Sequence, residues 1–273
     1  MDQGMRHASR RRPRRRPRFK GPSFNRMMPN LLTLLGLCAG LTSIRYALDA
    51  RWAAAALAIV IAAIIDGLDG RLARLLKATS RFGAEFDSLS DFCSFGVAPA
   101  IVLYIWSLHG ANRFAFMPCL MFTVCMALRL ARFNAALETS PKPAYAQSFF
   151  TGVPAPAGAG VVMLPLFLWL EAVDQGWVRM ADAAQYPGFV AAMLIGTSLL
   201  LVSSLPVWSF KNFKVPAEYV LALLLGTGFF AALLVADPWL ALAAAGLIYV
   251  LMLPLSVRSF RRLRAEAEEE FPA

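Results

Sequence analysis

The chain contains 273 residues, of which 58% are hydrophobic and only 16% are charged, and its mean hydropathy is +0.56. Soluble domains average roughly 45–50% apolar and about 25% charged residues, so this composition excludes an ordinary soluble domain. The apolar majority also excludes a disordered chain, and four cysteines are too few for a disulfide scaffold. The net charge of +10 would by itself suggest nucleic acid or an anionic membrane surface as a partner.

The positive charge is concentrated at the N-terminus. Residues 1–26 contain ten basic side chains and one acidic side chain, whereas the region 27–257 is nearly neutral. The segment 1–29 has few apolar residues and several prolines, which predicts a disordered basic cytoplasmic tail. We expect this tail to help set the membrane topology and to contact anionic lipid. Nucleic-acid binding is not expected, because the tail has neither interleaved aromatic residues nor a nucleic-acid-binding motif.

Eight segments are long and apolar enough to cross the hydrocarbon core as helices, which takes about 17–25 residues each. The predicted spans cover residues 30–48, 52–75, 85–107, 113–134, 150–171, 187–206, 216–236 and 238–256. The sequence therefore predicts an all-α polytopic membrane protein. The fifth span begins in a stretch rich in proline and glycine. This stretch favours either a helix break that opens a groove for lipid or close packing between helices.

The basic residues outside the spans predict the orientation of the chain in the membrane. With both termini in the cytoplasm, 23 Lys and Arg residues face the cytoplasm and 4 face the other side. We therefore expect a multi-pass protein of the inner (cytoplasmic) membrane. A charged cytoplasmic tail over 258–273 follows the last span.

Four aspartates lie inside two of the predicted spans. Asp66 and Asp69 are three residues apart on the second span, and Asp87 and Asp91 are four apart on the third, so each pair shares one helical face. Counted from the far end of each span at about 1.5 Å per residue, the two pairs lie at a similar depth. Because a carboxylate inside a membrane costs about 2.5–3.5 kcal/mol on insertion scales, four at one depth indicate a functional site.

Four ionised carboxylates at close range repel one another unless protons or cations neutralise them. Oxygen ligands suit Mg²⁺, Mn²⁺ or Ca²⁺, and a pair of divalent cations is a known arrangement for displacement at phosphorus. Two other interpretations stay open. The aspartates would form buried ion pairs, Asp66 and Asp69 with Arg71 or Arg74 and Asp87 and Asp91 with Arg129 or Arg132. Alternatively, they would line a cation or proton pathway in a transporter.

A run of 26 residues on the second and third spans resembles the signature of the CDP-alcohol phosphatidyltransferase family. Every fixed position of that signature is present: Asp66, Asp69, Gly70, Ala73, Arg74, Gly83, Asp87 and Asp91. Four further segments are similar to those of bacterial type II phosphatidylserine synthases, at residues 86–91, 94–100, 129–134 and 150–157.

The resemblance implies an enzyme that transfers the phosphatidyl group from CDP-diacylglycerol to the hydroxyl of L-serine. The products would be phosphatidylserine and CMP, formed by metal-assisted displacement at the β-phosphorus. The resemblance also implies a homodimer, a six-helix catalytic core over 30–206 and two further transmembrane helices over 207–257. The alternatives are the same chemistry with glycerol 3-phosphate or an inositol phosphate, a cation-coupled transporter, and a membrane adaptor that acts through its basic tail.

The resemblance also implies roles for single residues. The four aspartates would hold two divalent cations, Mg²⁺ or Mn²⁺ with Ca²⁺ as an alternative, and Asp91 would in addition accept the proton of the serine hydroxyl. The implied CDP-binding residues are Asp66, Gly67, Asp69, Gly70, Ala73, Arg74, Thr79, Ser80, Gly83 and Asp87. The candidates for acceptor or phosphate binding are Arg129, Arg132, Asn134 and Lys142. Thr79 and Ser80 can equally cap the third span, and Arg129 and Arg132 can equally mark topology.

Overall fold

The computed structural model describes residues 24–76, 78, 80–137, 149–208 and 217–270. Within these residues the chain is almost entirely helical. Six helices are long and apolar enough to cross a membrane, and there are up to eight spans if each of two bent helix pairs counts as one. This result confirms the predicted helical multi-pass class. Of the predicted disordered tail over 1–29, residues 1–23 lie outside the described residues, whereas residues 24–29 are helical, so the prediction of disorder was wrong for them.

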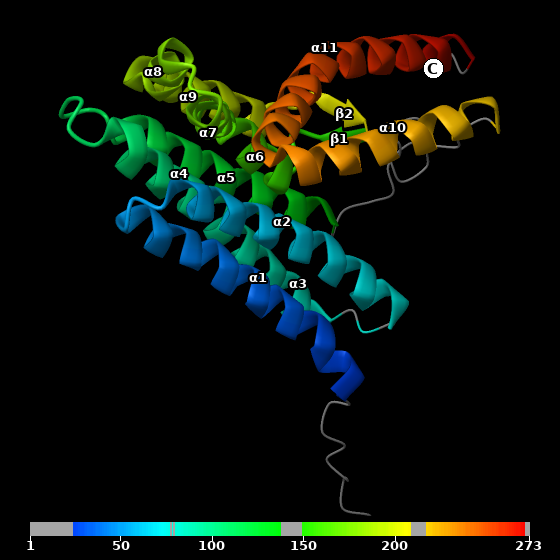
Figure 1. Ribbon diagram of the computed structural model, residues 1–273. Coiled ribbons are helices and arrows are strands. Elements are labelled where there is room, and N and C mark those ends of the chain that lie inside the picture. The colour runs from blue at the N-terminus through cyan, green and yellow to red at the C-terminus, as the bar shows by residue number, and fades with distance from the viewer. Residues whose placement is uncertain (1–23, 77, 79, 138–148, 209–216, 271–273) are drawn as a thin grey trace, which may run out of the picture.

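The first helices of the bundle lie side by side (Figure 1). Helix α1 covers Phe24–Leu48 and α2 covers Trp52–Leu75. The face of α2 that packs inward is built mainly of alanine, because Ala55, Ala56 and Ala62 are all buried. Small side chains allow two helices in a membrane to approach closely, and van der Waals packing then holds them together.

The third span is one continuous helical segment over Arg81–Leu108. It consists of α3 (Arg81–Asp91), a π-helical turn η1 (Phe92–Val97), α4 (Ala98–Leu103) and a second π-helical turn η2 (Tyr104–Leu108). π-Helical turns are rare and occur frequently at functional sites. Here η1 begins directly after Asp91. Helix α5 (Met117–Leu137) then packs against η1 and α9.

Gly40 on α1 allows the contact between α1 and this π-helical turn. A Cβ atom built on Gly40 would lie 2.7 Å from the Cα atom of Ser94, which is closer than real Cβ contacts. The buried hydroxyl of Ser94 also donates a long hydrogen bond, of 3.5 Å, to the carbonyl oxygen of Gly36. Only glycine at position 40 therefore permits this separation of the two helices.

The fifth and sixth spans are both bent. Helices α6 (Ala155–Val162) and α7 (Leu164–Asp174) meet at 45°, and α8 (Val178–Gln185) and α9 (Pro187–Val202) meet at 53°. Between the described helices the structure contains two short strands that the sequence did not predict. Strand β1 (Phe149–Thr151) pairs antiparallel with β2 (Pro206–Trp208), with Phe150 opposite Val207. The first residues of the predicted fifth span and the last residue of the predicted sixth span therefore belong to this small sheet and not to a helix.

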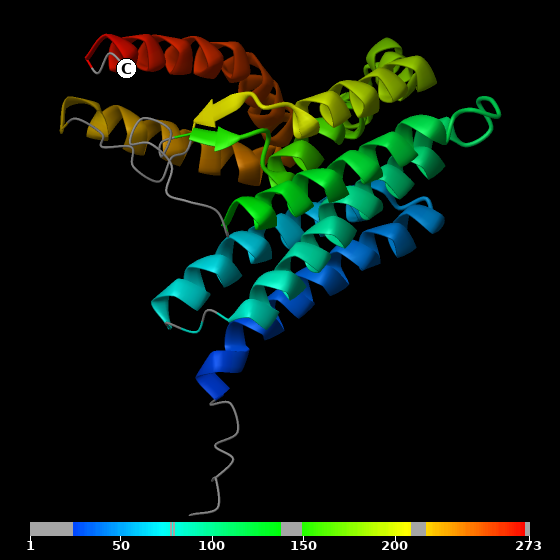
Figure 2. The ribbon, with the colours of Figure 1, turned by 180° about the vertical axis from the view of Figure 1, so that it is seen from behind.

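The C-terminal region is a helical hairpin of α10 (Ala217–Ala236) and α11 (Pro238–Glu270). Helix α11 packs against α6 and α7, and its second half turns to run over α10 (Figures 1 and 2). Pro254 lies inside α11, and a proline removes one backbone hydrogen bond and bends a helix. We expected the last span to end at residue 256, but the helix continues to Glu270 through most of the predicted charged tail.

Candidate active site

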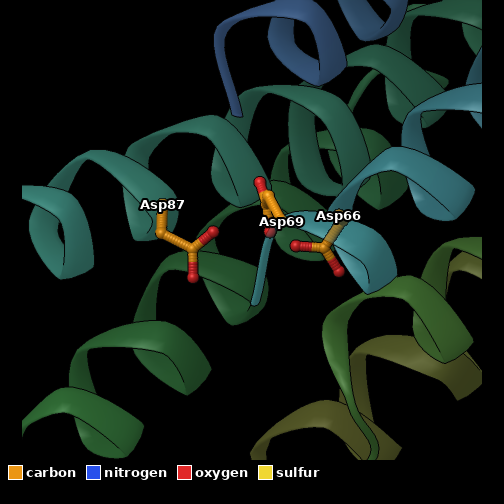
Figure 3. Close-up of side chains that lie close together, drawn as sticks. All are labelled: Asp66, Asp69 and Asp87. Carbon is orange, nitrogen blue, oxygen red and sulfur yellow. The ribbon is translucent and has the colours of Figure 1, made fainter. Parts of the chain in front are cut away.

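Three of the four intramembrane aspartates converge at one point. Asp66, Asp69 and Asp87 each offer a carboxylate oxygen, and these atoms lie within 4.8 Å of one another. Figure 3 shows the three side chains pointing toward a common centre, two from α2 and one from α3. Asp69 is buried, and the other two are half-buried. Three carboxylates at such range need a cation or protons between them.

Asp91 lies on the inner side of this cluster. Its carboxyl group is within hydrogen-bonding reach of the carboxyl group of Asp66. Asp66, Asp69 and Asp91 also share the wall of a small cavity with Ser90 and Ser94. All four aspartates that the periodicity placed at one depth therefore form a single acidic cluster.

A threonine from the first span fixes part of this cluster. The hydroxyl of Thr33 donates to a carboxylate oxygen of Asp69 at 2.7 Å, and it also lies 3.1 Å from the carbonyl oxygen of Pro29. The Ser90 hydroxyl in turn donates to the carbonyl oxygen of Thr33 at 3.2 Å. These buried contacts join α1, α2 and α3 at the level of the acids. Thr33 was not among the predicted site residues, because a single threonine in an apolar span is common.

A cavity of about 200 Å³ opens beside the acidic cluster. Seven of its lining residues were predicted to bind CDP: Asp69, Gly70, Ala73, Arg74, Ser80, Gly83 and Asp87. The other lining residues are Pro29, Asn30, Thr33, Ala78 and Ala84. The start of α1 therefore forms one wall of the cavity. The polar pair Asn30 and Thr33, three residues apart at the start of the first span, was the only signal of this wall in the sequence.

Ser80 connects this cavity to the start of α3. Its side chain accepts a hydrogen bond from the backbone N–H of Gly83 at 3.0 Å. Ser80 therefore caps α3, which was one of the two roles that the sequence suggested for it. A Cβ atom on Gly83 would lie 3.0 Å from the side-chain oxygen of Asn30, so the cavity wall is closely packed there. The N-terminus of a helix carries a partial positive charge that favours phosphate.

Some predicted residues lie elsewhere. Asp66 faces the acidic cluster rather than the larger cavity, and Gly67 is exposed and lines neither cavity. Thr79 and Lys142 lie outside the described residues.

The basic and polar candidates on α5 have different surroundings. The Nε atom of Arg129 donates to the carbonyl oxygen of Val153 at 2.7 Å, and its guanidinium lies close enough to Asp91 for their charges to interact. Asn134 contacts the hydroxyl of Ser88 on α3 at 3.0 Å.

Arg132 binds the C-terminal end of helix α9. Its two terminal nitrogens donate to the carbonyl oxygens of Val202 and Ser203, at 2.9 and 3.0 Å, where α9 ends. Next to it, Gly152 has a φ of +79°, and a Cβ atom there would lie 2.9 Å from a terminal nitrogen of Arg132. The left-handed backbone and the close guanidinium together explain why a glycine follows β1.

An acidic cluster within membrane helices, beside a cavity that ends at a helix N-terminus, could hold a divalent cation next to a phosphate group. The chain belongs to the CDP-alcohol phosphatidyltransferase family, whose model matches residues 26–193. A second model, described as CDP-alcohol phosphatidyltransferase 2, matches residues 218–254 in the C-terminal hairpin. The protein is therefore a multi-pass membrane transferase.

The chain is similar to several curated proteins along most of its length. The CDP-diacylglycerol–serine O-phosphatidyltransferase of Mycobacterium leprae is 41% identical over 253 residues, which cover 93% of this chain and 82% of that protein. The protein of the same name from Helicobacter pylori strain J99 is 36% identical over 190 residues, or 69% of this chain and 74% of the relative. An archaetidylserine synthase of Methanothermobacter thermautotrophicus is 36% identical over 186 residues, which cover 65% of this chain and 68% of that protein.

Proposed function

We propose that the protein transfers the phosphatidyl group of CDP-diacylglycerol to the hydroxyl of L-serine, which yields phosphatidylserine and CMP. The observation that carries this proposal is the acidic cluster of Asp66, Asp69, Asp87 and Asp91 beside a cavity lined by the family signature. The names of the relatives support serine as the acceptor.

The cavity beside the cluster binds the CDP part of the lipid substrate. Gly70 and Ala73 present little side chain, so a flat base or a pyrophosphate can approach the backbone of α2. Arg74 supplies a positive charge at the cavity wall, and the start of α3 supplies backbone N–H groups. Together these groups hold the diphosphate next to the acids.

Asp91 acts as the general base. It accepts the proton of the serine hydroxyl, and the oxygen forms a new bond to the β-phosphorus of CDP-diacylglycerol. The bond between that phosphorus and the bridging oxygen breaks, and CMP leaves with the bond's electron pair. A base is needed within hydrogen-bond reach because an alcohol is a weak nucleophile when protonated. Arg129 lies within electrostatic range of Asp91, and its positive charge suits a negatively charged group of the acceptor.

The acidic cluster fits a pair of hard divalent cations. Its oxygen donors, its spacing and its position beside the cavity suit Mg²⁺ or Mn²⁺, with Ca²⁺ as an alternative. Such cations would neutralise the charge on the diphosphate and on the departing CMP. Asp66, Asp69 and Asp87 would be their ligands, with Asp91 completing the set.

The same proposal includes the setting of the reaction. The catalytic core is the six-span part over 30–206, the spans of 207–257 follow it, and the enzyme is a homodimer. The excess of basic residues predicts that both termini and the active site face the cytoplasm, in the inner membrane. A site at that surface suits one lipid substrate and one water-soluble substrate.

The test is an assay of CMP release by purified protein in detergent with CDP-diacylglycerol, Mn²⁺ or Mg²⁺, and one acceptor at a time. We expect serine to be used in preference to glycerol 3-phosphate, inositol phosphate and ethanolamine. Asp91→Asn should lower kcat at least a hundredfold while the protein still binds CDP-diacylglycerol. Asp49→Asn, in an exposed ion pair with Arg45 at the other end of α1, is the matched control.

Two outcomes would contradict the proposal. Release of CMP with another acceptor but not with serine would show that the transfer reaction is right and that serine is the wrong acceptor. No release with any acceptor, together with ion or solute movement in sealed vesicles without CDP-diacylglycerol, would favour the transporter.

A further inference from the structure

An apolar groove of about 350 Å³ lies between α2, the bent pair α6–α7 and α11. From α2 it is lined by residues such as Ile59 and Ala63, and from α6 by Gly160, where a Cβ atom would meet no other heavy atom within 4 Å. Ala63 precedes Asp66 by three residues on α2, so one helical face leads from the groove to the acidic cluster. Gly158 instead packs closely against Leu201, which agrees with the close helix packing that the sequence suggested as one alternative.

Tyr249 of α11 is the one polar side chain among the residues that line this groove. Its hydroxyl oxygen is buried and has no hydrogen-bond partner among the described residues. A buried hydroxyl without a partner is unfavourable, because it has given up its bonds to water. The position of the side chain is set by packing. Gly246, one helical turn earlier, allows α11 to approach α7 so closely that a Cβ atom there would lie 3.1 Å from Leu164.

The Tyr249 phenol lies within electrostatic range of the guanidinium of Arg129. Both side chains lie at the start of α6, because Tyr249 lines the groove together with Pro156 and Arg129 binds the carbonyl oxygen of Val153. Arg129 uses its Nε–H for the carbonyl oxygen of Val153. Among the described residues no hydrogen bond is recorded for its two terminal NH₂ groups. A guanidinium with unused N–H groups and a phenol with an unused O–H form a pair of donors suited to a carboxylate.

The place of this donor pair relative to the acids identifies the carboxylate. Arg129 interacts with Asp91, which is the base in the proposed function. Only two carbon atoms separate the hydroxyl oxygen of serine from its carboxylate carbon, so the groups that bind the carboxylate must lie near the base. The diphosphate of the lipid, in contrast, belongs to the cavity of about 200 Å³ at the start of α3, which neither Tyr249 nor Arg129 lines.

We propose that Tyr249 and Arg129 together bind the carboxylate of the serine acceptor and thereby turn its hydroxyl toward Asp91. This inference rests on the proposed function. It gives the C-terminal hairpin a part in the active site, because Tyr249 comes from α11 and the family signature lies entirely on α2 and α3. The carboxylate would also satisfy the Tyr249 hydroxyl, which would then donate a charge-assisted hydrogen bond.

The experiment measures KM for serine, KM for CDP-diacylglycerol and kcat for wild-type protein, Tyr249→Phe and the control Tyr219→Phe. The first substitution removes only the hydroxyl in the groove, and the second removes an exposed hydroxyl from α10 of the same hairpin. Loss of a hydrogen bond to a charged group corresponds to a change of about tenfold or more. We therefore expect KM for serine to rise about tenfold in Tyr249→Phe, with KM for CDP-diacylglycerol unchanged and kcat nearly unchanged. Tyr219→Phe should match the wild type.

A second variant guards against a merely structural effect. Arg129→Lys keeps the charge but loses the planar pair of donors, and it should also raise KM for serine. If both side chains bind one carboxylate, the double variant should raise KM by less than the product of the two single effects. The melting temperature of each variant shows whether it folds like the wild type.

The results separate this inference from the function on which it depends. If the wild-type protein releases CMP with serine and Tyr249→Phe leaves KM for serine unchanged, this inference alone is wrong. A rise in KM for CDP-diacylglycerol instead would overturn it too, because the hydroxyl would then contact the lipid. If the wild-type protein releases no CMP with serine, the proposed function fails and this inference fails with it.

Discussion

The two ends of the chain use polar side chains in opposite ways. In α1–α3, the hydroxyl of Thr33 binds Asp69 on the next helix, and Ser90 binds the backbone of Thr33, so polar groups join separate helices. In α10, none of the residues of the span is buried, and the hydroxyl of Thr227 binds the carbonyl oxygen of Leu223 in its own helix. In α1–α3 polar contacts between helices therefore hold the acids in position, whereas the hydroxyl of Thr227 bonds within its own helix.

The largest effect should follow from a change to the acidic cluster itself. Asp69→Asn keeps the shape of the side chain but removes a negative charge and one carboxylate oxygen from the cluster. Loss of several kcal/mol of charge stabilisation should lower kcat about a hundredfold or more. The measurement is CMP release with serine at saturating CDP-diacylglycerol.

Metal binding provides a second measurement for the same variant. Mn²⁺ should raise the melting temperature of the wild type, since a ligand that binds only the folded state stabilises it, and it should raise that of Asp69→Asn much less. Asp182→Asn, which removes an exposed carboxylate on α8, should behave as the wild type in both measurements. Equal stabilisation of Asp69→Asn by Mn²⁺ would show that Asp69 is not a metal ligand.

A smaller effect is expected where α1 meets the π-helical turn after Asp91. Gly40→Ala places a methyl group against the backbone of Ser94, and excess volume in a packed interface costs about 1–3 kcal/mol. We expect a lower melting temperature and, because the turn directly follows the base Asp91, a lower kcat. Gly226→Ala in α10 is the matched control, because a Cβ atom there would meet no heavy atom within 4 Å. Equal behaviour of the two variants would mean that α1 does not fix the π-helical turn.

Composition and periodicity were enough to predict the class of the fold and the meeting of the acids. An apolar helix of about twenty residues has few other structures available, and residues spaced by three or four must share a helical face. That Asp66 and Asp87 would approach each other followed from matching depths on two neighbouring helices. These properties depend on local spacing, which a single sequence displays directly.

The remaining features depend on contacts between distant parts of the chain. Thr33 and Asp69 are 36 residues apart, and nothing near Thr33 distinguishes it from a threonine that bonds to its own helix. No residue pattern in the sequence marks the π-helical turn after Asp91, which lies where Gly40 of α1 approaches closely. Tyr249 looks like any aromatic residue in a late span until α11 is placed beside α6. Such contacts are set by packing, so the sequence alone did not identify them.

The smallest expected effect tests the difference between the two regions directly. Thr33→Val and Thr227→Val are the same substitution in two apolar helices, and each removes one hydroxyl while keeping the branched shape. Thr227 bonds only to its own backbone, so its loss should change neither activity nor metal dependence. Thr33 orients a carboxylate of the cluster, and loss of such a supporting contact typically lowers metal affinity about tenfold or more. The Mn²⁺ concentration for half-maximal CMP release should therefore rise about tenfold in Thr33→Val, while kcat at saturating Mn²⁺ stays close to that of the wild type. An unchanged Mn²⁺ dependence would mean that the hydrogen bond of Thr33 to Asp69 serves only the packing of α1 against α2. A contact of that kind would lower the melting temperature on its loss without altering the affinity for the cation.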